Sequence, residues 1–165
     1  LSCVELVISD AHKGLVAAIK QCFTGVSWQR CQVHFLRNIL SQVPKKGTQG
    51  FREQVKAIFR MNHVEEAREE KCRLMERFAE DKKYMKACEV LDEGFEDAFQ
   101  YAIVGKGQSR IRSTNLLERV NQELRRREKV VRIFPNQDSA TRLLGAVLMD
   151  IHETWISSPR TYMKN

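Results

Sequence analysis

The first 35 residues show two apolar, strand-like runs on either side of a helical pattern. Residues 4–10 are almost continuously apolar and end in an acid, which is typical of a strand that is buried on both faces. Residues 15–23 have the spacing of a short helix, and residues 28–35 alternate as a second strand would. Because a strand, a helix and a strand of this combined length have the size of a βαβ unit, we expect the two strands to be parallel.

Beyond residue 35 the pattern changes to helical spacing. Acidic and basic residues mix freely, and apolar residues recur at intervals of three and four, as in a small helical bundle. The pattern predicts helices over residues 35–43, 51–60, 64–79, 81–91, 93–104, 116–129 and 140–155. The fold class that follows is α/β and mostly helical.

Three parts are expected along the chain. Residues 1–35 hold the strand–helix–strand unit, residues 36–109 form an all-helical insertion, and residues 110–165 hold two further helices. A chain of 165 residues is long enough for one compact core with an inserted subdomain.

Positive charge is concentrated in one segment. Between residues 110 and 132 there are eight basic and three acidic residues, so this segment carries +5 of the net charge of +7. Such a stripe indicates a polyanionic partner, nucleic acid first and a membrane surface second. The alternative is a solvated helix face held by pairs such as Glu123 with Arg127, and charge alone leaves both interpretations open.

The five cysteines are odd in number and scattered, which argues against a disulfide framework and favours the reducing cytoplasm. No apolar run approaches the roughly 20 residues that a membrane-spanning helix needs. Cys31 and His34 have the spacing of half a zinc site, but zinc needs at least three protein ligands, and no second pair of thiols or imidazoles has suitable spacing. The favoured interpretation is a strand cysteine beside an imidazole that is bonded to the backbone.

Two carboxylates occupy positions that have more than one interpretation. Asp10 follows the first strand, and functional groups gather at the carboxyl ends of strands in open α/β sheets, where a carboxylate can hold Mg²⁺. It can equally cap the next helix. Glu118 falls at the N3 position of a helix capped by Asn115, as in a capping box, or it can face a cleft with arginines nearby to bind phosphates. Taken alone, each carboxylate is better explained as a helix cap.

Three long segments carry more specific information. They read VISDAHKGL at residues 7–15, WQRCQVHFLRNIL at residues 28–40, and RSTNLLERVNQELRRREKVVRIFPN at residues 112–136, the last followed by SATRLLGAVLMDIHETW at residues 139–155. Together and in this order, they resemble the Mutator family of bacterial insertion-sequence transposases. The resemblance covers essentially the whole chain, although in the helical middle only the layout matches.

The resemblance implies a partial ribonuclease-H-like core, with two parallel strands and helices, interrupted by the helical insertion. That family uses an Asp, Asp, Glu triad with Mg²⁺, or alternatively Mn²⁺. By resemblance, Asp10 matches the second aspartate and Glu118 the glutamate, as catalytic and metal-binding residues. Asn121 matches a residue close to the glutamate, and Cys31 with His34 matches a recurrent family motif of unknown role. The residues expected to bind DNA phosphates are Arg112, Arg119, Arg125, Arg126, Arg127 and Lys129.

The first aspartate of the triad has no match, because only nine residues precede Asp10. We therefore expect the chain to correspond to the C-terminal half of a transposase, to bind DNA weakly and to be inactive alone. The complete protein is expected to cleave element ends and join them to target DNA as a homo-oligomer, in the bacterial cytoplasm at the nucleoid and without a membrane. The alternatives are a basic helical protein that binds nucleic acid without chemistry, and a domain stabilised by zinc at Cys31 and His34.

Overall fold

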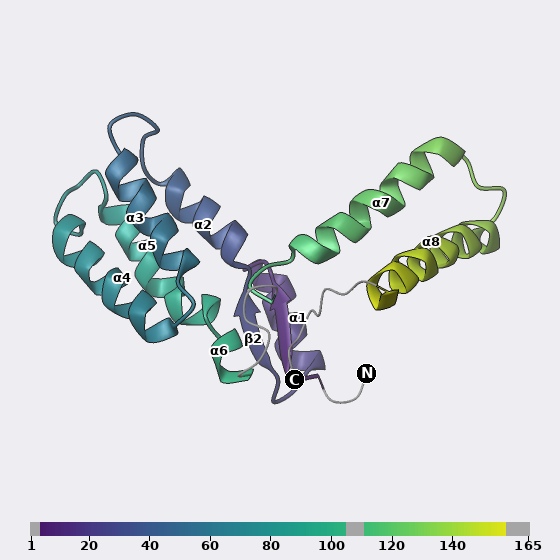
Figure 1. Ribbon diagram of the computed structural model, residues 1–165, viewed down its shortest axis with the longest axis horizontal. Helices are drawn as coiled ribbons and strands as arrows, with labels where there is room; N and C mark the ends of the chain where they lie inside the picture. Colours follow the sequence, from purple (N-terminus) through teal and green to yellow (C-terminus); the bar gives the residue numbers. More distant parts are fainter. Residues whose placement is uncertain (1–3, 105–110, 158–165) are drawn as a thin grey trace. The chain divides into compact units, whose positions relative to one another are not determined.

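The computed structural model describes residues 4–104 and 111–157. Most of these residues lie in helices, and a small parallel sheet accompanies them (Figure 1), which confirms the predicted α/β, mostly helical fold class. The chain divides into two compact units, the first ending at Ser113 and the second beginning at Thr114. The finer division at residues 35 and 109 stays a prediction.

The sheet belongs to the first unit. Strands β1 (Leu6–Ser9) and β2 (Ser27–Arg30) are parallel and are joined by helix α1 (Lys13–Cys22). Leu6 lies opposite Ser27, and Ser9 lies opposite Arg30. The predicted βαβ unit with parallel strands is therefore confirmed.

The second strand is shorter than the sequence predicted. β2 ends at Arg30, and helix α2 (Gln32–Ser41) begins two residues later, so the strand over residues 28–35 is wrong in its second half. The side chains of Phe35, Ile39 and Val43 recur at intervals of four residues and are all buried. This helical periodicity outweighs the short alternation of Cys31, Val33 and Phe35.

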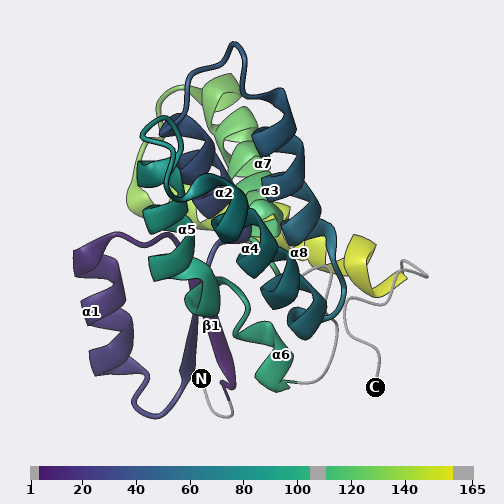
Figure 2. The ribbon, with the colours of Figure 1, turned by 90° about the vertical axis from the view of Figure 1, so that its left-hand side faces the viewer.

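Helices α3 (Gln49–Arg60), α4 (Val64–Phe78) and α5 (Met85–Ala98) pack with α2 into a bundle, and the four-residue helix α6 (Tyr101–Val104) follows it. Figure 2 shows the bundle above the strands, with α1 lying beside them. The core is aromatic: the rings of Phe95 and Phe99 stack with centroids 4.6 Å apart, and those of Phe59 and Phe99 stack at 5.7 Å. α5 contacts β2, and this contact connects the bundle to the sheet.

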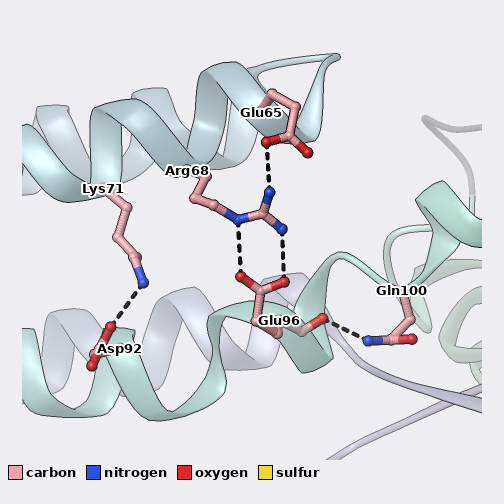
Figure 3. A network of polar contacts seen from close by, with 6 residues as sticks. All are labelled: Glu65, Arg68, Lys71, Asp92, Glu96 and Gln100. Atoms are coloured by element: carbon pink, nitrogen blue, oxygen red, sulfur yellow. Dashed lines mark hydrogen bonds and ion pairs between the residues drawn. The ribbon is translucent and has the colours of Figure 1, made fainter.

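A polar clamp holds α4 against α5 (Figure 3). The guanidinium of Arg68 donates two parallel hydrogen bonds to the carboxylate of Glu96, at 3.1 and 3.0 Å, and a third to Glu65 at 2.6 Å. Lys71 pairs with Asp92 at 2.8 Å one helical turn away.

Because α5 runs without interruption from Met85 to Ala98, the prediction of two helices over residues 81–91 and 93–104 is wrong.

The second unit is a helical hairpin of α7 (Asn115–Val131) and α8 (Gln137–Ser157), as Figure 1 shows. Both predicted helices are confirmed, each with a few more residues at its ends. α7 ends at Val131, because the next residue, the C-cap Arg132, has a φ of 62°, which is incompatible with a further helical turn. Among the helices that the structure describes, none combines the length and the apolar character that a membrane span requires.

Candidate active site

The parallel sheet places Asp10 next to Cys31. Since Ser9 is the last paired residue of β1 and lies opposite Arg30, the next residues on the two strands, Asp10 and Cys31, follow at the same edge. The backbone N–H of Cys31 donates to the carbonyl of Ser9 at 2.9 Å, which continues the ladder by one bond beyond β2. Cys31 is thus the residue before α2. The sequence had predicted a strand residue here, and that prediction is wrong.

His34 joins these two residues from the first turn of α2. Its Nδ1 atom lies 2.7 Å from Oδ1 of Asp10, a close polar contact that becomes an ion pair when the imidazole is protonated. One ligand atom each from Asp10, Cys31 and His34 all lie within 4.8 Å of one another. The thiol of Cys31 is fully buried, whereas the side chains of His34 and Asp10 are 34% and 53% exposed. The cluster is therefore closed by the buried Cys31 on one side and open to solvent at Asp10 and His34.

The backbone around Asp10 is fixed by two further hydrogen bonds. The indole Nε1 of Trp28 donates to Oγ of Ser9 at 2.8 Å, and that hydroxyl donates to the carbonyl oxygen of Asp10 at 2.9 Å. Asp10 does not occupy the N-cap of α1: that position belongs to His12, whose side chain makes no capping hydrogen bond. The helix-cap interpretation of Asp10 is wrong, and its carboxylate is held instead by His34.

Glu118 belongs to the second unit, in the first part of α7. The N-cap of α7 is Thr114, and Asn115 is already helical, so the capping box with Asn115 is wrong. The hydroxyl of Thr114 donates to Oε1 of Glu118 at 3.0 Å, and this bond orients a half-buried carboxylate. The structure thus brings Asp10 together with Cys31 and His34, while the pairing of Asp10 with Glu118 stays a prediction.

The basic residues of the charged segment have different surroundings. Arg112 belongs to the first unit, where its guanidinium lies 5.0 Å from the ring centroid of Tyr101 and donates weakly to the carbonyl of Phe59 at 3.5 Å. Arg126 and Arg127 both bond to Glu123, at 2.7 and 3.2 Å, which is the pairing expected of a solvated helix face. The pKa of Glu123 is lowered, chiefly by the hydrogen bond from Arg126.

The other basic side chains of α7 lie on the surface of the helix. Arg125, Lys129 and Arg132 line a shallow hollow together with Glu128, since these positions follow one another at intervals of three and four. Arg119 and Asn121 are also exposed. This side of α7 can bind phosphate groups, and the roles of the six basic residues in DNA binding stay predictions.

Known proteins resemble the chain over almost all of its length. The family model described as "Transposase, Mutator family" matches residues 1–158. The chain belongs to the Mutator family of transposases. The "Transposase for insertion sequence element IS256 in transposon Tn4001" of Staphylococcus aureus is 62% identical over 159 residues, which are 96% of this chain and 41% of that protein.

More distant Mutator-family relatives extend over the same region. The "Transposase for insertion sequence element ISRM5" of Rhizobium meliloti is 36% identical over 95% of this chain and 39% of its own length. The "Transposase for insertion sequence element IS1081" of Mycobacterium tuberculosis is 37% identical over 97% of this chain and 38% of its own length. The chain thus spans about two fifths of the curated relatives it matches.

The sequence did not predict the contact between His34 and Asp10. The zinc interpretation of Cys31 and His34 considered only thiols and imidazoles, and it omitted carboxylates. The contact follows from the structure, in which two parallel strands that end at Ser9 and Arg30 bring the following residues together. Strand register is the missing quantity, and composition and spacing do not supply it.

Proposed function

We propose that this chain provides two of the three carboxylates with which a Mutator-family transposase cleaves and joins DNA. The observation that carries the proposal is the position of Asp10, which lies at the carboxyl end of β1 with about half of its side chain exposed. Functional groups of open α/β sheets gather at this edge. The membership in a transposase family makes DNA the substrate that this edge would meet.

Asp10 and Glu118 would hold Mg²⁺, or alternatively Mn²⁺, with carboxylate oxygens, the donors that such hard cations prefer. When bound, two such ions stabilise the attacking and the leaving oxygens of a phosphodiester. His34 contacts one oxygen of Asp10, so the other oxygen can serve as a ligand while the carboxylate keeps its orientation. The hydroxyl of Thr114 does the same for Glu118.

The exposed basic side chains of α7 would bind the DNA backbone. Arg119, Arg125 and Lys129 are all exposed on α7. Glu118 lies in the first turn of the same helix. Contacts with phosphates are strong and sensitive to salt, and they do not depend on base sequence. We infer that α7 positions DNA phosphates near Glu118, both on element ends and on target DNA. The complete protein would do this as a homo-oligomeric complex at the bacterial nucleoid.

The test is a transposition assay with the complete transposase that contains these residues. Asp10→Asn and Glu118→Gln each remove a charge without changing the size of the side chain, and both are expected to reduce DNA cleavage and joining to background while DNA binding is retained. Glu153→Gln, an exposed glutamate on α8, is the matched control and should transpose normally. Normal transposition by either of the first two variants would overturn the proposal.

A second candidate function is binding to nucleic acid without chemistry, and the basic hollow on α7 favours it. The double variant Arg125→Ala with Lys129→Ala should reduce the salt dependence of DNA binding by about two phosphate contacts. Arg73→Ala, an exposed arginine on α4, is the control and should leave the salt dependence unchanged. Both functions predict this result, so the carboxylate variants decide between them.

A further inference from the structure

We propose that Asp10, Cys31 and His34 form a binding site for a divalent transition metal that prefers thiolate and imidazole ligands, with Zn²⁺ as the leading candidate. The three side chains supply one sulfur, one nitrogen and one oxygen, and their ligand atoms lie within 4.8 Å of one another. This set differs from an oxygen-only magnesium site, because a thiolate selects zinc or a similar soft ion. The inference rests on this cluster alone and goes beyond the proposed strand-transfer function.

The cluster has the form of an open three-ligand zinc site. Sites of this kind use three protein ligands and keep the fourth position for water or another small ligand. Cys31 is buried and supplies the base of the site, while Asp10 and His34 are partly exposed and leave one side accessible to solvent. An ion could therefore enter from solvent without opening of the core.

The required changes in geometry are small. Tetrahedral zinc with bonds of about 2.0–2.3 Å has ligand atoms roughly 3.5 Å apart. The contact between Asp10 and His34, now 2.7 Å, must widen, and the largest separation must shorten by about 1 Å. The partly exposed side chains of Asp10 and His34 can make these changes by adjusting their torsion angles, so the buried Cys31 can stay in place.

The backbone that carries the ligands is already fixed. Cys31 is held by its N–H bond to Ser9 and by the bond that its carbonyl accepts from the N–H of Phe35, both 2.9 Å long. Asp10 is held through the Trp28 and Ser9 hydrogen bonds. Metal sites need ligands on rigid elements, and a strand end together with a first helical turn satisfies this requirement.

The site would share Asp10 with the magnesium role proposed above. An ion held by Cys31 and His34 would engage the same carboxylate, so a soft metal and Mg²⁺ could not use Asp10 independently. Excess Mg²⁺ offers no competition for the thiolate or imidazole, because its preferred ligands are oxygens. The metal test can therefore be done without DNA and without the strand-transfer reaction.

The experiment uses the 165-residue chain, freed of metal with a chelator and titrated with Co²⁺ as a spectroscopic probe for zinc. We expect one equivalent to bind with a thiolate-to-cobalt charge-transfer band and with the strong visible bands of four-coordinate cobalt. Zn²⁺ should displace the cobalt, and excess Mg²⁺ should leave the thiolate-to-cobalt band in place. Absence of the charge-transfer band from the folded chain would overturn the proposal.

Variants assign the ligands. Cys31→Ser should remove the charge-transfer band. Loss of a residue that only hydrogen-bonds to a metal ligand lowers metal affinity about 10–100-fold, and His34→Gln should lower the affinity by more than this. His34→Gln changes a partly exposed residue, so it keeps the test valid if the buried serine variant fails to fold. Cys72→Ser, an exposed thiol on α4, is the control and should bind as the unmodified chain does. A band that persists in folded Cys31→Ser, or is lost in Cys72→Ser, would refute the assignment.

Discussion

Gln29 is the buried polar residue whose loss should cost the first unit the most. Its side chain is fully buried in β2. Nε2 donates to the carbonyl of Ile111 at 2.5 Å, and Oε1 accepts from the N–H of Tyr101 at 2.6 Å. These bonds join β2 to two backbone positions that lie 72 and 82 residues later in the chain.

The substitution Gln29→Leu keeps a similar volume and removes both bonds. An unpaired buried backbone group costs about 1–3 kcal/mol, and Tyr101 N–H is the more deeply buried of the two partners. The apolar leucine recovers a fraction of this loss, so we expect the free energy of unfolding to fall by about 2–4 kcal/mol. At about 2–4 °C per kcal/mol for a chain of this size, Tm should fall by roughly 5–15 °C.

Urea and thermal unfolding followed by circular dichroism measure the change, and hydrogen exchange locates it, since the amide of Tyr101 should exchange faster in the variant. Gln21→Leu, an exposed glutamine on α1, is the matched control and should stay within about 0.5 kcal/mol of the unmodified chain. If Gln29→Leu is as stable as this control and the Tyr101 amide exchanges no faster, the two bonds do not stabilise the fold and the reasoning is refuted.

Two further predictions concern titration of described side chains. The hydrogen bond from Arg68 lowers the pKa of Glu96 below its usual 4.5, so the stabilisation it gives is complete above that pH and is lost as the pH falls through the lower, folded value. Thermal unfolding should therefore show a lower Tm for Arg68→Ala than for the unmodified chain at neutral pH, and this difference in Tm should shrink in acid. A difference in Tm that stays constant with pH would contradict the prediction. Burial raises the pKa of Cys88 to about 11, so iodoacetamide at mildly alkaline pH should label Cys22 and Cys72 in the folded chain, and Cys88 only after unfolding, as mass spectrometry can determine.

The helical pattern was predictable wherever a single face of a helix is buried. In α3, the apolar residues Phe51, Val55, Ile58 and Phe59 follow helical spacing and are all buried, as periodicity requires. Local periodicity failed at the start of α2, where only a few residues alternate before the helical spacing becomes clear. It failed again in α5, where the prediction separated two helices at residue 92 although the helix runs without a break from Met85 to Ala98.

Gly94, two residues beyond this predicted break, shows how tertiary packing determines a residue inside α5. A Cβ atom at this position would lie 2.5 Å from the guanidinium of Arg30 and 2.7 Å from the ring of Phe35. The glycine therefore lets β2 and α2 approach α5 closely, and it does not end the helix. A glycine inside a helix costs about 1 kcal/mol relative to alanine, and the close packing of Phe35 offsets that cost. Sequence spacing alone contains no information about the approaching side chains.

The candidate site was predictable in part for the same reason. The position of Asp10 after an apolar strand was enough to propose a functional carboxylate, because that argument needs only the order of elements along the chain. The contact of Asp10 with His34 needs the register of β1 against β2 and the early start of α2. Both are set by packing between distant segments, so they appear only in three dimensions.

The four residues from Gln29 to Gln32 explain how the helical bundle and the site are connected. Gln29 bonds to Tyr101 and Ile111, the Arg30 guanidinium lies 4.1 Å from the ring centroid of Phe35, and Nε2 of Gln32 donates to the carbonyl of Ala98 at 2.8 Å. Burial lowers the pKa of Arg30, although the nearby acids on α5 act in the opposite direction. Cys31 lies between these anchors, so the strand end that faces Asp10 is fixed by the bundle itself. The bundle is therefore a structural support of the Asp10 cluster, because β2 cannot shift without breaking these contacts.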